Sequence, residues 1–310
     1  MKLVFMGTPD FSVTILRSIY EAGYEILEVV TGEDKPKGRG RELAMPKVKE
    51  YALKEKLKVY QPHSLKDPAV TDHFKELKAD IYVVAAYGKI LPKELLELPS
   101  YGCVNVHASL LPKYRGAAPI QWAVINGDEE SGVTIMQMNE GLDTGDIIMA
   151  ESLKLAEDET GESLFERLSV LGGKLIVKAL EKLEKKEIIP KKQDESRASY
   201  VGLLKKEMGR LDFNKGALEL ERMIRGLYSW PGAYFELKGK KIKVFKASVI
   251  KHEDDMEAGS IISLDKKGLL IKTGKDALNI TEIQLEGKKR MTVGDFLLGN
   301  KIFENISMLG

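Results

Sequence analysis

The stretch KLVFMGTPDFSVTILRSIY (residues 2–20) predicts a strand, a tight loop and a helix in succession. The apolar run at residues 2–6 stops at a glycine, and Thr8 is placed to cap a helix whose first turn holds Pro9. Apolar side chains then recur at the spacing of one helical face. A second apolar run at residues 25–30 completes a strand–helix–strand unit, which is typical of a parallel sheet.

The same alternation continues along the chain. Further strands are predicted at residues 58–60, 81–86, 103–107, 133–138 and 146–153, and helices at residues 47–56, 71–78 and 162–184. This order of elements is that of a parallel sheet covered on both faces. We therefore expect a Rossmann-like α/β domain over residues 1–189, with a mostly parallel sheet and helices on both faces.

The pattern changes after Pro190, and at 310 residues the chain is long enough for two domains. Residues 190–208 are polar and lack periodicity, which predicts a linker. Over residues 209–310 a helix is followed by short strands that glycines interrupt, at residues 233–237, 241–249, 260–263, 269–272 and 278–284. Short strands with frequent turns favour a small C-terminal β-barrel of the OB-like kind.

Charge is unevenly distributed although the net charge is only +1. Residues 1–204 carry 28 Lys and Arg against 32 Asp and Glu, and residues 205–310 carry 20 against 15. A basic C-terminal part suits a polyanionic partner. The single cysteine, Cys103, rules out an internal disulfide, and no apolar run is long enough for a membrane span. We expect a cytoplasmic protein with no membrane association.

Chemistry is concentrated in GCVNVHASLLPKYRG (residues 102–116). Asn105 and His107 lie two apart on a predicted strand, so they share one face at its carboxyl end, where open α/β sheets bind ligands. A hydrogen-bonded core histidine is the plainer interpretation. The neighbouring carboxamide and the proline-containing loop that follows favour a functional site instead.

A third polar group is expected from the glycine-rich loop MNEGLDTGD (residues 138–146). Asp143 and Asp146 are both placed to orient the imidazole of His107, and spacing leaves the choice open. The loop also has the composition of an ordinary turn.

Asn-x-His, the following Ser-Leu-Leu-Pro and the later Gly-Leu-Asp-Thr-Gly-Asp together resemble the signature of folate-dependent formyltransferases. The resemblance implies that Asn105, His107 and Asp143 are the catalytic residues. Segments at residues 6–11, 86–91 and 116–121 resemble the branch of that family that acts on methionyl-tRNA. The similarity implies 10-formyltetrahydrofolate as formyl donor and charged initiator tRNA as acceptor.

The residue types agree with this chemistry. An amide N–H from Asn105 would stabilise the oxyanion of the tetrahedral intermediate, a contribution of about 3–4 kcal/mol in comparable sites. An imidazole exchanges protons near neutral pH, and Asp143 would fix the tautomer of His107 and stabilise its charged form. No metal is expected, because the four histidines and one cysteine lack zinc-ligand spacing.

The resemblance also implies where the reduced folate binds, although apolar loops of this kind are more often plain packing. The implied residues are Ser109, Leu110, Leu111 and Pro112 in one loop. Tyr87, Gly88, Ile90 and Leu91 form the second implied group, the pterin wall, against which the pterin ring of the folate would lie.

Two basic segments are candidates for tRNA contact. The glycine-rich loop at residues 34–42 resembles the insertion with which the family holds the tRNA acceptor end, through Arg39 flanked by Lys37 and Arg41. Lys240, Lys243 and Lys246 belong to a lysine cluster on a predicted C-terminal hairpin, where even spacing would place Lys240 and Lys246 on one face. Solvated surface is the alternative for both segments.

Other functions remain open at the level of sequence. The same catalytic residues would serve formyl transfer to glycinamide ribonucleotide or to a nucleotide-linked amino sugar, or hydrolysis of the formyl-folate. A catalytically silent RNA-binding protein is the alternative of another class, and the intact trio argues against it. The basic loop and the lysines favour tRNA, and we expect a monomer.

Overall fold

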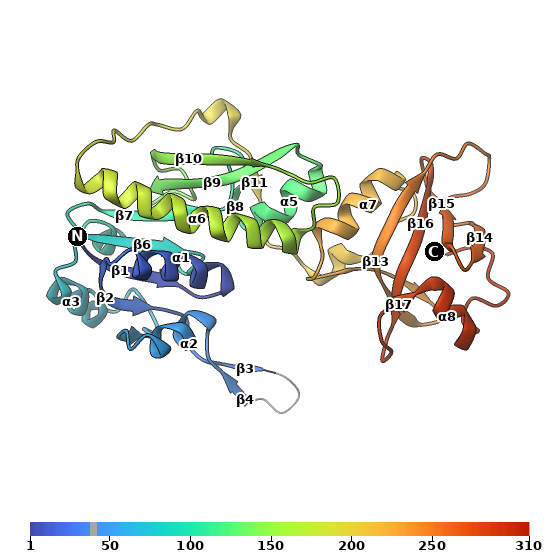
Figure 1. Ribbon diagram of the computed structural model, residues 1–310, viewed down its shortest axis with the longest axis horizontal. Helices are drawn as coiled ribbons and strands as arrows, with labels where there is room; N and C mark the ends of the chain where they lie inside the picture. The colour runs from blue at the N-terminus through green and yellow to red at the C-terminus, as the bar shows by residue number, and fades with distance from the viewer. Residues whose placement is uncertain (38–41, 310) are drawn as a thin grey trace. The chain divides into compact units, whose positions relative to one another are not determined.

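The structure, a computed structural model, describes residues 1–37 and 42–309 (Figure 1). The chain forms two compact units, each built from several segments. Unit 1 comprises Met1–Pro119, Ser131–Leu153 and Phe165–Val201, and unit 2 comprises Ile120–Glu130, Lys154–Leu164 and Gly202–Gly310. No helix in the described ranges is long and apolar enough to cross a membrane.

Unit 1 contains a mostly parallel sheet, which confirms the predicted α/β class. The sheet has seven strands among the described residues, in the order β10-β9-β7-β6-β1-β2-β5. Their bounds are β1 (Lys2–Gly7), β2 (Glu25–Val30), β5 (Val59–Tyr60), β6 (Ile81–Ala85), β7 (Cys103–His107), β9 (Glu130–Gln137) and β10 (Ile147–Lys154). β7 pairs with β6 in parallel and with β9 antiparallel. The strand order turns at β1, between β6 and β2, which is where such sheets bind ligands.

Helices cover both faces of this sheet. On one face, Val4 and Met6 of β1 pack with Phe74 of α3 (Pro68–Leu77) and with Leu95 of α4 (Lys93–Leu96). On the other, α6 (Gly161–Glu184) approaches so closely that a Cβ on Gly172 would lie 3.1 Å from Val106 Cγ1. Figure 1 shows α6 and α1 (Asp10–Glu21) running along that face. The remaining helix of this region is α2 (Lys47–Lys54).

The loop after β1 differs from the expectation for Thr8. The N-cap of α1 is Pro9, and no side chain caps the helix. The Thr8 hydroxyl instead donates to the Tyr87 carbonyl at 3.1 Å and so ties the loops after β1 and β6 together. Gly7 is required by close packing, since a Cβ there would lie 2.6 Å from the Cβ of Ser12.

Several short elements were not predicted. β3 (Lys35–Lys37) and β4 (Glu42–Ala44) form an antiparallel pair that borders residues 38–41. α5 (Pro119–Asn126) follows the active-site segment along the chain. β8 (Arg115–Gly116) pairs in parallel with β11 (Tyr200–Val201), so the segment after α6 lies beside the segment that follows β7.

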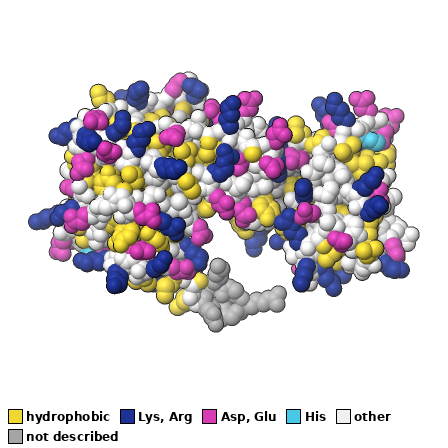
Figure 2. Space-filling view, viewed as in Figure 1, with side chains coloured by type: hydrophobic (Ala, Val, Ile, Leu, Met, Phe, Trp, Pro, Cys, Tyr) yellow, Lys and Arg dark blue, Asp and Glu magenta, His cyan; other side chains and the backbone are white. Residues whose placement is uncertain are grey.

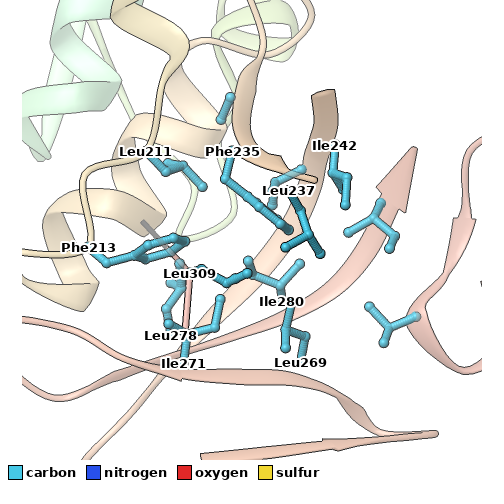
Figure 3. Packing of buried hydrophobic residues seen from close by; sticks show 14 of the residues in the cluster. Leu211, Phe213, Phe235, Leu237, Ile242, Leu269, Ile271, Leu278, Ile280 and Leu309 are labelled. Atoms are coloured by element: carbon cyan, nitrogen blue, oxygen red, sulfur yellow. The ribbon is translucent and has the colours of Figure 1, made fainter. Parts of the chain in front are cut away.

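Unit 2 is built around antiparallel strands, as predicted for the C-terminal part. The pairing order is β12-β13-β16-β15-β14, with β17 on β16. The elements are α7 (Ala217–Gly226), β12 (Ala233–Leu237), β13 (Lys240–Ile250), β14 (Ile261–Asp265), β15 (Gly268–Lys272), β16 (Ala277–Leu285), β17 (Met291–Thr292) and α8 (Val293–Gly299). Figure 3 shows Phe213, Phe235 and Ile280 converging in the apolar core that this sheet encloses with α7.

Candidate active site

Asn105 and His107 lie on one face of β7, as predicted. The strand's buried residues include Val104 and Val106, which point to the α6 side, while Cys103 on the opposite face joins the core under α3. Asn105 is half-buried, and among the described residues its side chain has no hydrogen-bond partner. Its two amide N–H donors are therefore available to a substrate.

The imidazole of His107 is buried and held on one side. Its Nε2 lies 2.9 Å from the carbonyl oxygen of Tyr114. Because a carbonyl only accepts hydrogen bonds, we assign the proton of the neutral ring to Nε2. Nδ1 then carries the lone pair, and it lies 3.7 Å from Oδ2 of Asp143. This separation is an ion-pair distance and is too long for a direct hydrogen bond.

Of the two candidate carboxylates in this loop, Asp143 is the one that lies near His107. Its Oδ2 accepts the backbone N–H of Gly116 at 2.8 Å. Asp143 has φ +52°, a left-handed conformation that Asp tolerates better than most residues. Asp146 joins the sheet through its backbone, where its carbonyl accepts the N–H of Gln137 at 2.8 Å.

The loop after β7 is rigidly hydrogen-bonded. The Ser109 hydroxyl donates to the Lys113 carbonyl at 2.6 Å, and Thr134 on β9 donates to the Ser109 carbonyl and accepts the Leu111 N–H. Ser109 and Leu111 are buried, whereas Leu110 and Pro112 are partly exposed. Only the latter two of the four predicted folate residues in this loop present appreciable surface.

The predicted pterin wall also divides into buried and exposed members. Tyr87 and Leu91 belong to the core under α3, and burial raises the pKa of the Tyr87 hydroxyl to about 12. Ile90 is 90% exposed and Gly88 is exposed with φ +79°. An apolar side chain that projects into solvent from a loop beside a polar site is a natural contact for a flat ligand.

A hollow of about 570 Å³ lies at the carboxyl ends of β1 and β2, beside this wall. Its lining contains Tyr87 and Gly88 but none of Asn105, His107 and Asp143. The rest of its lining comes from the loops after β1, β2 and β6, from the β3–β4 hairpin and from the residues between β4 and α2: Thr8, Pro9, Gly32, Glu33, Lys35, Pro36, Ala44, Met45, Pro46, Ala86 and Lys89.

A buried arginine beside the trio was not singled out from the sequence. Arg115 has no exposed side-chain surface and bonds to Gln193, Glu195 and Tyr200. The hydrogen bonds that Arg115 donates to Glu195 raise the pKa of Arg115, with burial opposing them, and the same bonds lower the pKa of Glu195. These partners fall within the predicted linker, whose polar composition gave no sign of them. In the described part of the chain no three His, Cys, Asp or Glu side chains are grouped to hold a metal ion.

The residues predicted to contact tRNA are described unequally. Arg39 and Arg41 lie outside the described residues, and Lys37 is described only as part of β3. Lys240, Lys243 and Lys246 are all exposed. The expectation that even spacing places Lys240 and Lys246 on one face is wrong, because β13 has register shifts between Val244 and Ala247.

The bulge changes which lysines lie together. Ile242 and Val244, which share the parity of Lys240, are buried in the core. Since the shift inserts Phe245, Lys246 returns to the outer face with Lys243. Figure 2 shows basic side chains spread over the visible face of both units with acidic ones between them.

Comparison with known families agrees with this arrangement. Residues 1–180 match the model of the family described as Formyl transferase, and residues 203–301 match Formyl transferase, C-terminal domain. The chain belongs to the formyl transferase family. The methionyl-tRNA formyltransferase of Agathobacter rectalis is 50% identical to it, with 98% of each chain covered. That of Caldanaerobacter subterraneus is 47% identical, again over 98% of each chain.

Solved structures of more distant proteins share the fold. An N-formyltransferase from Helicobacter canadensis, in complex with folinic acid and dTDP-3-aminofucose, aligns with a TM-score of 0.66 at 19% identity. The alignment covers 90% of the present chain and 99% of the Helicobacter canadensis chain. HypX from Aquifex aeolicus in complex with tetrahydrofolic acid aligns with a TM-score of 0.64 at 18% identity over 98% of this chain, which spans about half the length of HypX.

Proposed function

We propose that this enzyme transfers the formyl group of 10-formyltetrahydrofolate to the α-amine of methionyl initiator tRNA in the cytoplasm, for translation initiation. The observation that carries the substrate is 50% identity over 98% of both chains to a methionyl-tRNA formyltransferase. The observation that supports the chemistry is the grouping of Asn105, His107 and Asp143 at the carboxyl end of β7.

The assigned roles follow from the geometry of these side chains. The amine nitrogen forms a bond to the formyl carbon, and the carbon–N10 bond of the folate breaks. Asn105 donates an N–H to the oxygen that becomes negative in between, since its amide has no partner among the described residues. His107 accepts the proton of the amine at Nδ1 and then passes it to N10 of the folate. Meanwhile the Nε2–H remains hydrogen-bonded to the Tyr114 carbonyl. Asp143 stabilises the doubly protonated ring across 3.7 Å.

The folate is assigned to the surface between the two predicted loops. Ile90 and Gly88 on one side and Leu110 and Pro112 on the other supply exposed apolar or backbone surface for a flat pterin. Tyr87, Leu91, Ser109 and Leu111 hold these loops from within the core. Arg39 with Lys37 and Arg41, and Lys240, Lys243 and Lys246, are assigned to tRNA.

The decisive experiment compares acceptors with one preparation of purified protein. Charged initiator tRNA, glycinamide ribonucleotide and a nucleotide-linked amino sugar are each incubated with 10-formyltetrahydrofolate, and formylated product and free tetrahydrofolate are measured. We expect formylated methionyl-tRNA, with kcat/KM for the small amines at least about 10³-fold lower. Faster transfer to either small amine, or folate release without an acceptor, would overturn the proposal.

A further inference from the structure

Arg115 carries a charge that is buried without touching the substrate site. Burying a guanidinium is costly unless every N–H has a partner. Arg115 meets that condition with five hydrogen bonds, which match its five donors. Glu195 takes two at 2.8 and 2.6 Å, Tyr200 takes one at 2.8 Å, and Gln193 takes two at 3.0 and 2.8 Å.

The two bonds to Gln193 decide how its amide is oriented. A guanidinium only donates, so the atom of Gln193 that faces Arg115 is the carbonyl Oε1. The amide Nε2 therefore points the other way, where it donates to the carbonyl of Asp143 at 2.8 Å and to that of Gly145 at 2.7 Å. Arg115 thus fixes the amide, and the amide holds the backbone on both sides of Thr144.

The loop that Gln193 holds needs an external restraint. Asp143 is in the left-handed region at φ +52°, and such residues persist where surrounding contacts determine them. Its carboxylate is fixed by the N–H of Gly116, the residue that follows Arg115 in β8. β8 is itself paired with β11, and the Arg115 N–H donates at 2.8 Å to the carbonyl of Ser199, the residue before β11.

We propose that Gln193, held in orientation by Arg115, is a positioning residue that keeps Asp143 beside Nδ1 of His107. Neither residue is assigned contact with substrate, and both act through the carboxylate. The proposal rests on the proposed role of Asp143. It gives a positioning role to one residue of the segment after α6, which the sequence suggested was only a linker.

Gln193→Glu is the sharpest test, because it preserves shape and the acceptor for Arg115 while replacing two N–H donors by an oxygen. That oxygen would face the carbonyls of Asp143 and Gly145 and displace the loop. A displacement near 1 Å in an active site lowers turnover by about 10²-fold. We expect kcat to fall by about that factor, with KM for the folate unchanged. Gln193→Met, which removes the donors without adding charge, serves if the Glu variant does not fold.

A double-mutant cycle distinguishes positioning from a general structural defect. If Gln193 acts through Asp143, adding Gln193→Glu to Asp143→Asn should change kcat by less than about threefold beyond the single Asp143 variant. Fully multiplicative losses would overturn the proposal, as would a wild-type kcat in a folded Gln193→Glu or Gln193→Met variant. Asp194→Asn, an exposed neighbour whose carboxylate accepts only from Ser196 among the described contacts, is the matched control and should keep wild-type kcat.

The outcome is separable from that of the proposed function. The cycle measures coupling between two residues of unit 1 and needs only an amine that the wild-type enzyme formylates. Should the wild-type enzyme prefer a small amine, the proposed tRNA substrate fails, and the same cycle run with that amine still tests the role of Gln193.

Discussion

The amide of Asn105 is set apart from the other polar groups of the site by having no protein partner among the described residues. A half-buried donor without a partner favours a ligand that brings an acceptor. Asn105→Asp preserves the shape and removes both N–H donors, so we expect kcat to fall about 10²–10³-fold while thermal stability changes little. Steady-state kinetics at saturating folate and tRNA measure this. Near-wild-type kcat in Asn105→Asp would exclude the oxyanion role.

The two carboxylates of the 138–146 loop offer an internal comparison at the same scale. Asp143→Asn leaves an amide beside His107 that cannot stabilise a charged ring, and we expect a severe loss of kcat despite the near-identical shape. Asp146→Asn alters a side chain whose backbone, not its carboxylate, bonds to the sheet, and it should retain most activity. A larger loss in the Asp146 variant would reverse the assignment.

At the scale of elements, the sequence predicted the helices and strands that have a regular pattern of apolar residues. The seven strands of the main sheet in unit 1 fall close to the predicted ranges, and β1 and β6 among them are continuous apolar runs because both of their faces are buried. β8 and β11 have two residues each and carry no periodicity, and their pairing joins segments about 85 residues apart. The sequence around Gln193 and Arg115 contains no pattern that predicts such a contact. The prediction of Asn105, His107 and Asp143 came from short motifs that resemble a family signature, whereas the residues that support them are distant in sequence and belong to no such motif.

The β3–β4 hairpin gives a prediction at the element scale. Lys35 and Ala44 on its two strands line the hollow at the end of β1, and Arg39 lies between them in the sequence. Arg39→Ala should lower kcat/KM for charged tRNA about 10- to 100-fold, the effect of one charged hydrogen bond, and leave folate binding unchanged. Arg39→Lys should restore it only in part, because the planar fork is lost.

Kinetics with varied tRNA and a folate titration test this prediction. Arg197→Ala removes an exposed arginine of unit 1 elsewhere and is the control. Equal losses in the two variants would mean that net charge, and not the place of Arg39, matters.

At the scale of the whole molecule, the net charge of +1 is the sum of two parts of the chain that carry opposite net charge. The N-terminal 204 residues are slightly acidic, and the excess of Lys and Arg lies in the C-terminal 106. The proposed catalytic residues lie in unit 1, while the outer face of the unit 2 sheet carries Lys243 and Lys246 on a bulged strand. A long polyanion suits such an arrangement, because phosphate contacts on one unit add to affinity without altering the reacting groups on the other.

Replacing Lys240, Lys243 and Lys246 together by Gln should therefore weaken tRNA binding and flatten its dependence on salt. Each lost phosphate contact lowers the slope of log K against log salt concentration by somewhat under one unit, so three contacts give about two units. kcat at saturating tRNA should stay near wild type, since none of the three lies in unit 1. Titrations at several salt concentrations measure the slope.

The control replaces Lys266, Lys267 and Lys301, three exposed lysines of the same unit, and removes the same charge. If both triple variants flatten the slope equally, attraction is a property of the unit's overall charge. If the first leaves it unchanged, this face of β13 does not contact tRNA.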